Sequence, residues 1–118
     1  MTDDWAPIQR THEGIEEVDP AWLGANTDAA QIVDVRELDE FIGPLGHIEG
    51  AELLPLGILS TKLETLDASQ PVVTVCHSGG RSAHAYVLLK QAGFTRVANM
   101  TGGMLRWHEL GLPVSRQA

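Results

Sequence analysis

The single cysteine of the chain, Cys76, stands where an apolar stretch meets a predicted helix, and this junction constrains the fold most. Residues 72–75 indicate a short interior strand because three of the four are valine, and the pattern from Ser82 onward indicates a helix. Residues 76–81 then form a loop. Its backbone N–H groups and the start of the helix favour negative charge at one point, so we expect a thiol placed there to ionise readily.

Stretches typical of strands alternate along the chain with stretches typical of helices. Strands are expected at 15–18, 31–35, 52–54, 72–75 and 96–99, and helices at 19–24, 37–42, 56–66, 82–92 and 104–110. This alternation predicts an α/β fold with a mainly parallel sheet and helices on both faces. Such sheets bind ligands at the carboxyl ends of their strands, and Cys76 stands at one of these ends.

The length of 118 residues and a hydrophobic content of 43% predict one domain with its own core. Residues 1–12 lack periodicity and are expected to be an extension of uncertain order, which leaves 13–118 as the domain. The sequence contains neither a recognisable leader nor an apolar run long enough for a membrane span, so a cytoplasmic location is expected. One cysteine allows no internal disulfide, which fits a reducing compartment.

The net charge of −8 argues against general affinity for nucleic acid or for an anionic membrane. The charge is unevenly distributed, because fifteen of the sixteen acidic residues lie at or before Asp67 and five of the eight basic residues follow it. Two interpretations are open. The acidic half forms a solvated surface, or the half that contains Cys76 keeps carboxylates away so that an anionic substrate can approach.

Four motifs in order resemble the single-domain rhodaneses. They are Asp34-Val35-Arg36-Glu37, the turn at 46–51, the loop at 76–82, and Gly102-Gly103-Met104-Leu105-Arg106-Trp107 followed by the ending at 111–114; the resemblance spans residues 13–115. It implies a five-stranded parallel α/β fold and a sulfurtransferase in which Cys76 is the catalytic residue. Cys76 would take a sulfane sulfur from a small anionic donor such as thiosulfate, hold it as a persulfide, and pass it to cyanide or a thiol. A thioredoxin-like protein is one candidate thiol acceptor.

The rest of the loop supplies the expected substrate-binding residues: His77, Ser78, Gly79, Gly80, Arg81 and Ser82. Converging amides, a helix start and the Arg81 cation would all lower the pKa of a thiol and would also hold an anionic persulfide. Each role has a structural alternative. Arg81 and Ser82 could serve only to cap the helix, and His77 could point to solvent.

Three further residues are expected to support the loop without contacting substrate: Asp34, Arg36 and His47. Asp34 and Arg36 flank a strand end, where they can pair with each other or with loop amides. His47 lies between glycines and is expected to anchor its turn. The five histidines lack the spacing of metal ligands, and one cysteine cannot form a zinc knot, so neither a metal nor another cofactor is expected.

Two alternatives to the sulfurtransferase enzyme stay open. A cysteine and an arginine that bracket an amide-lined loop also suit a phosphatase or an arsenate reductase. In the phosphatases that this fold resembles, the loop has one more residue between the two, so the four residues between Cys76 and Arg81 favour sulfur over a tetrahedral oxyanion. The second alternative is a persulfide carrier or a protein-interaction module without turnover of its own.

Overall fold

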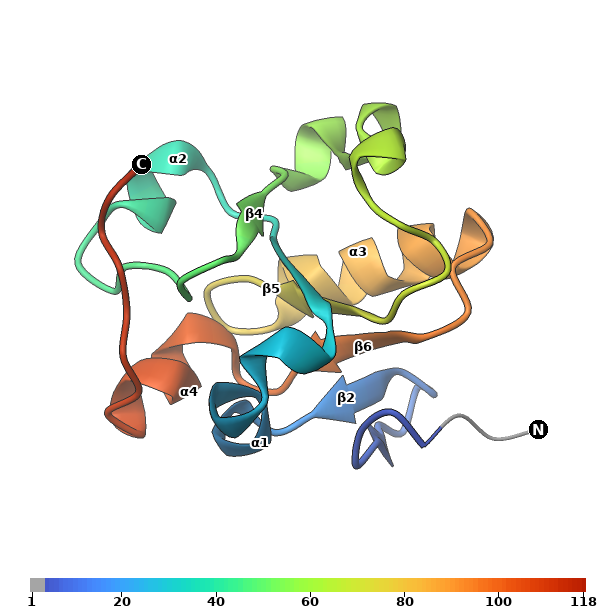
Figure 1. Cartoon of the computed structure of the whole chain (residues 1–118), viewed down its shortest axis with the longest axis horizontal. Helices are drawn as coiled ribbons and strands as arrows, with labels where there is room; N and C mark the ends of the chain where they lie inside the picture. The colour runs from blue at the N-terminus through green and yellow to red at the C-terminus, as the bar shows by residue number, and fades with distance from the viewer. Residues whose placement is uncertain (1–3) are drawn as a thin grey trace.

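A mostly parallel sheet runs through the middle of the computed structural model, which describes residues 4–118 (Figure 1). Its six strands lie in the order β1-β2-β6-β5-β3-β4, and every neighbouring pair is parallel except β1 and β2. The predicted fold class is confirmed, with one strand more than the five expected. The strands are β1 (Gln9–Arg10), β2 (Glu16–Val18), β3 (Gln31–Asp34), β4 (Glu52–Leu53), β5 (Val72–Val75) and β6 (Val97–Met100).

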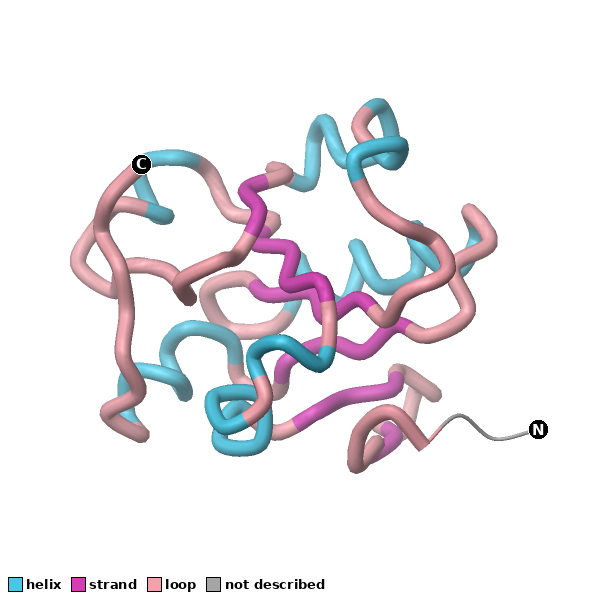
Figure 2. The backbone as a smooth tube through the Cα atoms, viewed as in Figure 1, coloured by secondary structure: helices cyan, strands magenta, loops and turns pink. Residues whose placement is uncertain are grey.

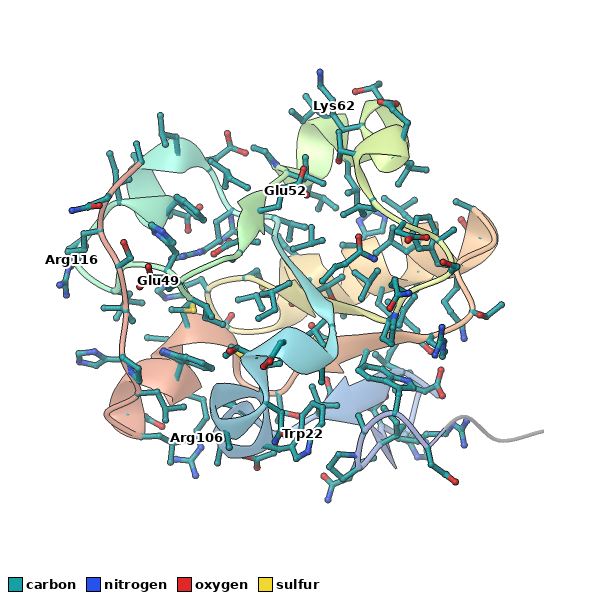
Figure 3. All side chains as sticks on the ribbon, viewed as in Figure 1. Trp22, Glu49, Glu52, Lys62, Arg106 and Arg116 are labelled. Carbon is teal, nitrogen blue, oxygen red and sulfur yellow. The ribbon has the colours of Figure 1, made fainter. Side chains whose placement is uncertain are left out.

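Helices cover both faces of this sheet, and the strands lie between them in Figure 2. The helix α3 and the 3-10 helices η2 and η3 contribute to the core on one face, whereas α1 and α4 contribute to the core on the other. Charged side chains such as Arg106 and Arg116 project from the surface (Figure 3). The helices are α1 (Pro20–Ala25), η1 (Thr27–Ala29), α2 (Leu38–Phe41), η2 (Leu56–Thr61), η3 (Leu63–Thr65), α3 (Gly80–Gln91) and α4 (Gly103–Glu109).

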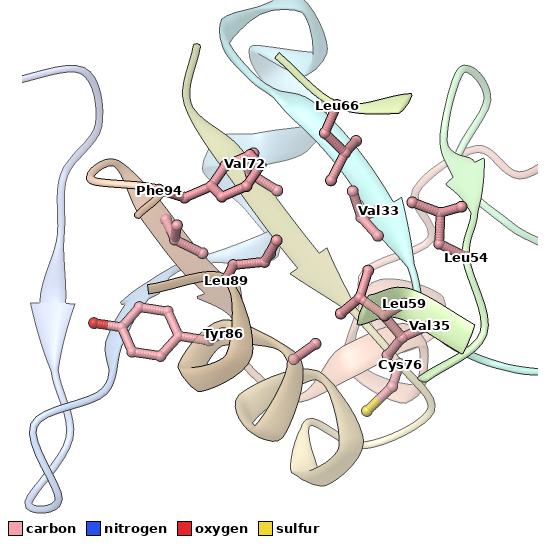
Figure 4. Packing of buried hydrophobic residues seen from close by; sticks show 12 residues of the cluster. Val33, Val35, Leu54, Leu59, Leu66, Val72, Cys76, Tyr86, Leu89 and Phe94 are labelled. Atoms are coloured by element: carbon pink, nitrogen blue, oxygen red, sulfur yellow. The ribbon is translucent and has the colours of Figure 1, made fainter. Parts of the chain in front are cut away.

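Alternating residues of each strand face opposite sides of the sheet and divide the core into two clusters. Val72 of β5 belongs to the cluster that includes Leu89 of α3, while the next residue, Val73, belongs to the cluster that includes Trp107 of α4. All four residues of β5 are buried, as expected for a parallel strand covered on both faces. Cys76 lies in the α3 cluster, near Leu59 (Figure 4).

Local signals set the ends of several helices. The Asp19 side chain accepts a hydrogen bond from the Ala21 N–H at 2.7 Å, and Pro20 occupies the first turn of α1, so the predicted helix start is confirmed. A reciprocal pair of side-chain bonds between Glu37 and Glu40 caps α2. Gly93 follows α3 at φ +101°, a left-handed conformation that favours glycine.

The predicted continuous helix at 56–66 is wrong, because two 3-10 helices, η2 and η3, replace it. Four of the apolar residues fall in two pairs, Leu56 with Leu59 and Leu63 with Leu66, and the members of each pair are three residues apart. That spacing matches the three residues per turn of a 3-10 helix. Lys62 separates the two helices, so the chain makes two tight turns here instead of one long helix.

Part of the predicted N-terminal extension joins the sheet. β1 pairs with β2 in the register Gln9 with Glu17 and Arg10 with Glu16. Trp5 packs edge-to-face against Trp22 of α1, with ring centroids 6.3 Å apart. Residues 1–3 lie outside the described residues, and a domain boundary at residue 12 stays a prediction. Within residues 4–118, none of the helices is both long and apolar enough to cross a membrane.

The core on the α3 face can be tested by truncating Leu89, which is fully buried. Leu89→Ala is expected to lower the free energy of unfolding by about 2–5 kcal/mol, because it removes buried methyl groups and leaves a cavity. Urea denaturation monitored by circular dichroism measures this loss. Val87→Ala on the same helix is the control, since Val87 is 36% exposed; an equal loss in both variants would contradict the described packing.

Candidate active site

The sequence after β5 places Cys76 at the carboxyl end of a central strand and turns at once into α3. The helix begins at Gly80, two residues earlier than predicted, so Arg81 and Ser82 lie in its first turn. Gly79 precedes the helix at φ +116°, where a side chain would strain the backbone. The loop between strand and helix is therefore only four residues long, and it curls around the Cys76 side chain.

The Cys76 sulfur is buried and surrounded by hydrogen-bond donors. Its Sγ accepts from the Gly79 N–H at 3.1 Å and from the Ser82 hydroxyl at 3.3 Å. Burial raises the pKa of the Cys76 thiol, but the Ser82 hydroxyl and the N–H groups of Ser82, Gly79 and Ser78 outweigh burial and lower this pKa below its ordinary value. The side chain is 1% exposed. Loop amides thus converge on the sulfur, and the Ser82 hydroxyl contributes directly to this set.

The first turn of α4 holds the other side of the loop. The Met104 N–H donates to the Cys76 carbonyl at 2.8 Å and the Leu105 N–H donates to the His77 carbonyl at 3.0 Å. Because the C=O and N–H of a trans peptide point in opposite directions, fixing the His77 carbonyl outward turns the Ser78 N–H inward. A Cβ on Gly103 would come within 2.6 Å of the Cys76 and His77 carbonyl oxygens. Glycine at this position is therefore required for the contact.

Two buried polar residues beneath the loop were missed by the sequence reasoning. The Thr74 hydroxyl donates to the Ser82 carbonyl at 2.9 Å, and the Asn99 amide donates to the Gly79 carbonyl at 3.3 Å and to Glu17 at 3.0 Å. Each is a polar residue within an otherwise apolar strand. That pattern was the available signal, since a buried polar side chain needs a partner.

Arg81 does not donate to the cysteine. Its two terminal nitrogens each donate to the Glu40 carboxylate at 2.8 Å. The hydrogen bond from Arg81 lowers the pKa of Glu40 to about 2, and Glu40 raises the pKa of Arg81 above its already high value. The interpretation that this half of the chain keeps carboxylates from the loop is wrong, because the fold returns Glu40 from the acidic half to its edge.

Asp34 and Arg36 form a buried pair close to Glu40. Arg36 donates from Nη2 and Nε to the two Asp34 oxygens at 2.8 and 2.9 Å, and both side chains are 1% exposed. The Arg36 guanidinium also donates to the carbonyls of Gly46 and Glu40, at 2.7 and 3.2 Å. The pair thus connects β3, α2 and the turn at residue 46, which is the geometry expected of a supporting pair.

The remaining predicted residues lie around this centre. His47 Nδ1 donates to the Phe41 carbonyl at 2.7 Å and its ring stacks on Phe41, so it anchors the turn. His77, Ser78 and Gly80 are exposed at the rim. A groove of about 430 Å³ runs beside the loop, with His77, Glu40 and Leu105 in its wall. Within residues 4–118, no cluster of three or more His, Cys, Asp or Glu side chains is placed to hold a metal ion.

Comparison with known proteins gives a consistent result. The model of the rhodanese-like domain family matches residues 19–110. A sulfurtransferase of Allochromatium vinosum is 33% identical over 103 residues, covering 85% of this chain and 94% of that protein. The thiosulfate sulfurtransferase GlpE of Shewanella oneidensis is 37% identical over 81 residues, covering 69% of this chain and 78% of that protein.

A solved structure agrees with these relatives. A rhodanese-related protein of Thermoplasma volcanium superposes with a TM-score of 0.79 at 32% identity, covering 86% of this chain and 98% of that one. Other curated relatives are longer, and the chain spans 60% or less of the length of several of them.

The donors around Cys76 predict the effect of removing the Ser82 hydroxyl. Ser82→Ala is expected to raise the pKa of Cys76, because the thiolate loses a hydrogen bond that stabilises its charge. Thiolate absorbance in the ultraviolet, followed from acid to alkaline pH, measures this change. Ser78→Ala is the control, because it keeps the Ser78 N–H; a larger shift in the control would contradict the assignment.

The close approach at Gly103 predicts a second effect. Gly103→Ala is expected to lower the free energy of unfolding by at least about 2 kcal/mol, because the residue has φ +61° and a Cβ would meet the loop carbonyls. Chemical denaturation gives the value. Gly80→Ala serves for comparison, since a Cβ at Gly80 meets nothing within 4 Å; similar losses in the two variants would show that the contact is unimportant.

Proposed function

Since this chain belongs to the rhodanese-like domain family, we propose that it is a sulfurtransferase that carries sulfur as a persulfide on Cys76. The observation that carries the proposal is the set of hydrogen-bond donors on the Cys76 sulfur, from the Gly79 N–H and the Ser82 hydroxyl. A thiolate is the nucleophilic form of cysteine, and these donors favour it. A sulfane-sulfur compound such as thiosulfate is the proposed donor, and cyanide or a thiol is the proposed acceptor.

In the first half-reaction the Cys76 thiolate attacks the outer sulfur of thiosulfate. A new S–S bond forms on Cys76, the S–S bond of thiosulfate breaks, and sulfite leaves with its electron pair. In the second, the acceptor attacks the outer sulfur of the persulfide: cyanide leaves as thiocyanate, and the Cys76 thiolate is restored. Negative charge stays on the cysteine side chain throughout, so the same donors can stabilise both states.

The residues around Cys76 have distinct proposed roles. The N–H groups of Ser78 and Gly79 hold the sulfur atoms, and the exposed side chains of His77 and Ser78 meet the donor at the rim. Gly80 leaves open space there. Arg81, Asp34, Arg36 and His47 shape the wall behind the site rather than contact the reacting sulfur.

The persulfide must be resolved from outside, because this sequence has no second cysteine. A small thiol, cyanide or a thioredoxin-like protein would serve as acceptor. We propose the cytoplasm as the location, since a reducing compartment keeps a lone thiol available.

A carrier that only holds the persulfide for a partner is the second candidate, and it is favoured by the burial of the Cys76 sulfur, which limits access. The pairing of Arg81 with Glu40 makes a phosphatase less suitable, because an oxyanion would need that guanidinium.

Intact-mass measurement after incubation with thiosulfate tests the proposal. We expect the mass to rise by one sulfur atom, to return to its starting value on addition of cyanide with release of thiocyanate, and to stay unchanged in Cys76→Ser. Because Cys76 is the single cysteine, an added sulfur can be assigned to it.

Two other results would redirect the assignment. An adduct that forms but is not released to cyanide or to a small thiol would favour the carrier. The absence of an adduct with any sulfane donor, together with hydrolysis of a phosphate ester, would reject sulfur transfer.

A further inference from the structure

The Glu40–Arg81 pair neutralises the guanidinium that lies at the edge of the Cys76 loop. Arg81 is near enough to the cysteine to contribute to the electrostatics of the site, since the Cys76 charge is one of the causes that raise its pKa. Both of its terminal nitrogens are nevertheless engaged by Glu40. The neighbouring guanidinium, Arg36, is likewise paired with Asp34. The site therefore has two cations and two anions, with little net positive charge.

Glu40 is fixed in this position by more than the ion pair. Its Oε1 also accepts from the Glu37 N–H at 3.0 Å, and its carbonyl accepts from buried Arg36 at 3.2 Å. The side chains of Arg81 and Glu40 are 39% and 30% exposed, so a ligand can reach the pair. Glu40 and His77 also line the groove beside the loop. Glu40, the acidic partner of Arg81, therefore faces a donor that binds in this groove.

We propose that Glu40 determines which sulfur donor Cys76 uses, by neutralising Arg81 and so disfavouring the thiosulfate dianion relative to an organic hydropersulfide, R–S–SH. The proposal rests on the proposed sulfurtransferase function. A hydropersulfide carries at most one negative charge on its sulfur atoms. Its approach to a thiolate in a neutral site is less unfavourable than that of a dianion, because Coulomb repulsion scales with the product of the charges.

The transfer from a hydropersulfide is chemically balanced. The Cys76 thiolate attacks the outer sulfur of R–S–SH, an S–S bond forms on Cys76, and the S–S bond of the donor breaks with its electron pair going to R–S⁻. The proton of the outer sulfur passes to the leaving thiolate, which departs as R–SH. The product on the enzyme is the same Cys76 persulfide that thiosulfate would give.

The groove offers apolar contact for the carbon body of such a donor. Pro44, Leu45 and Leu105 line it, and Leu105 is 42% exposed. The sulfite group of thiosulfate has no apolar surface that could contact these groove residues. The groove and the neutralised guanidinium therefore favour the same class of donor.

Single-turnover persulfide formation with two donors, thiosulfate and benzyl hydropersulfide, tests the proposal by intact mass. Glu40→Gln keeps an oxygen acceptor for the Glu37 N–H but removes the charge that neutralises Arg81. We expect the rate constant with thiosulfate to rise about tenfold and that with benzyl hydropersulfide to rise about threefold or less, because the effect on a dianion is at least twice as large in free energy. Added salt is expected to reduce the gain with thiosulfate.

Two control variants separate this effect from a general loss of negative charge. Glu40→Asp keeps the charge and is expected to keep the donor preference of the unmodified protein. Glu64→Gln removes an exposed carboxylate that does not line the groove and that, within residues 4–118, is not an ion-pair partner of Arg81. Its effect on thiosulfate is expected to be below twofold. Thermal melting of each variant confirms that it is folded.

The outcomes are distinguishable. An equal change for both donors in Glu40→Gln, or an equal gain with thiosulfate in Glu64→Gln, would overturn the role of Glu40 while leaving sulfur transfer intact. A failure of the unmodified protein to form a persulfide with either donor would overturn the sulfurtransferase itself. A selective gain with thiosulfate in Glu40→Gln alone supports the proposal.

Discussion

The orientation of a few peptide groups is the constraint on which the site depends. The Leu105 N–H of α4 donates to the His77 carbonyl, which leaves the Ser78 N–H of the same peptide facing the Cys76 sulfur, and Asn99 holds the Gly79 carbonyl. Each trans peptide then presents its N–H to the opposite side. The site thus depends on α4 and β6, which hold loop carbonyls, as well as on α3, whose Ser82 donates to the sulfur.

The charges near the loop are paired, one pair between residues close in the sequence and the other between residues 41 positions apart. Asp34 with Arg36 and Glu40 with Arg81 place two carboxylates of the acidic half among the basic groups around the loop. The first pair is buried, and loss of one partner from a buried pair is costly because it leaves an unpaired charge. The Glu40–Arg81 pair is partly exposed. It therefore affects the charge that an approaching ligand meets more than it affects the free energy of unfolding.

Much of the fold was accessible from the sequence, because strands and helix ends have local signals. The valine-rich run before Cys76, Asp19-Pro20 at a helix start and Gly93 at a helix end each follow from nearby residues alone. The site was only partly accessible. The partner of Arg81 lies 41 residues away, and the contact at Gly103 arises where α4 meets the loop, so both depend on how elements pack. Thr74 and Asn99 could be noticed as polar residues in strands, but their partners could not.

The antiparallel strand β1 has a consequence for how copies of this chain meet. An open sheet exposes unpaired N–H and C=O groups along each outer strand, and long outer strands can recruit strands of other molecules into aggregates. Here β1 covers one side of β2, and the sheet ends in β1 on one side and β4 on the other, each only two residues long. Arg10 and Glu52 add charge to these short borders. The sheet therefore offers little template for intermolecular pairing, even though its central strands are among the most apolar segments of the chain.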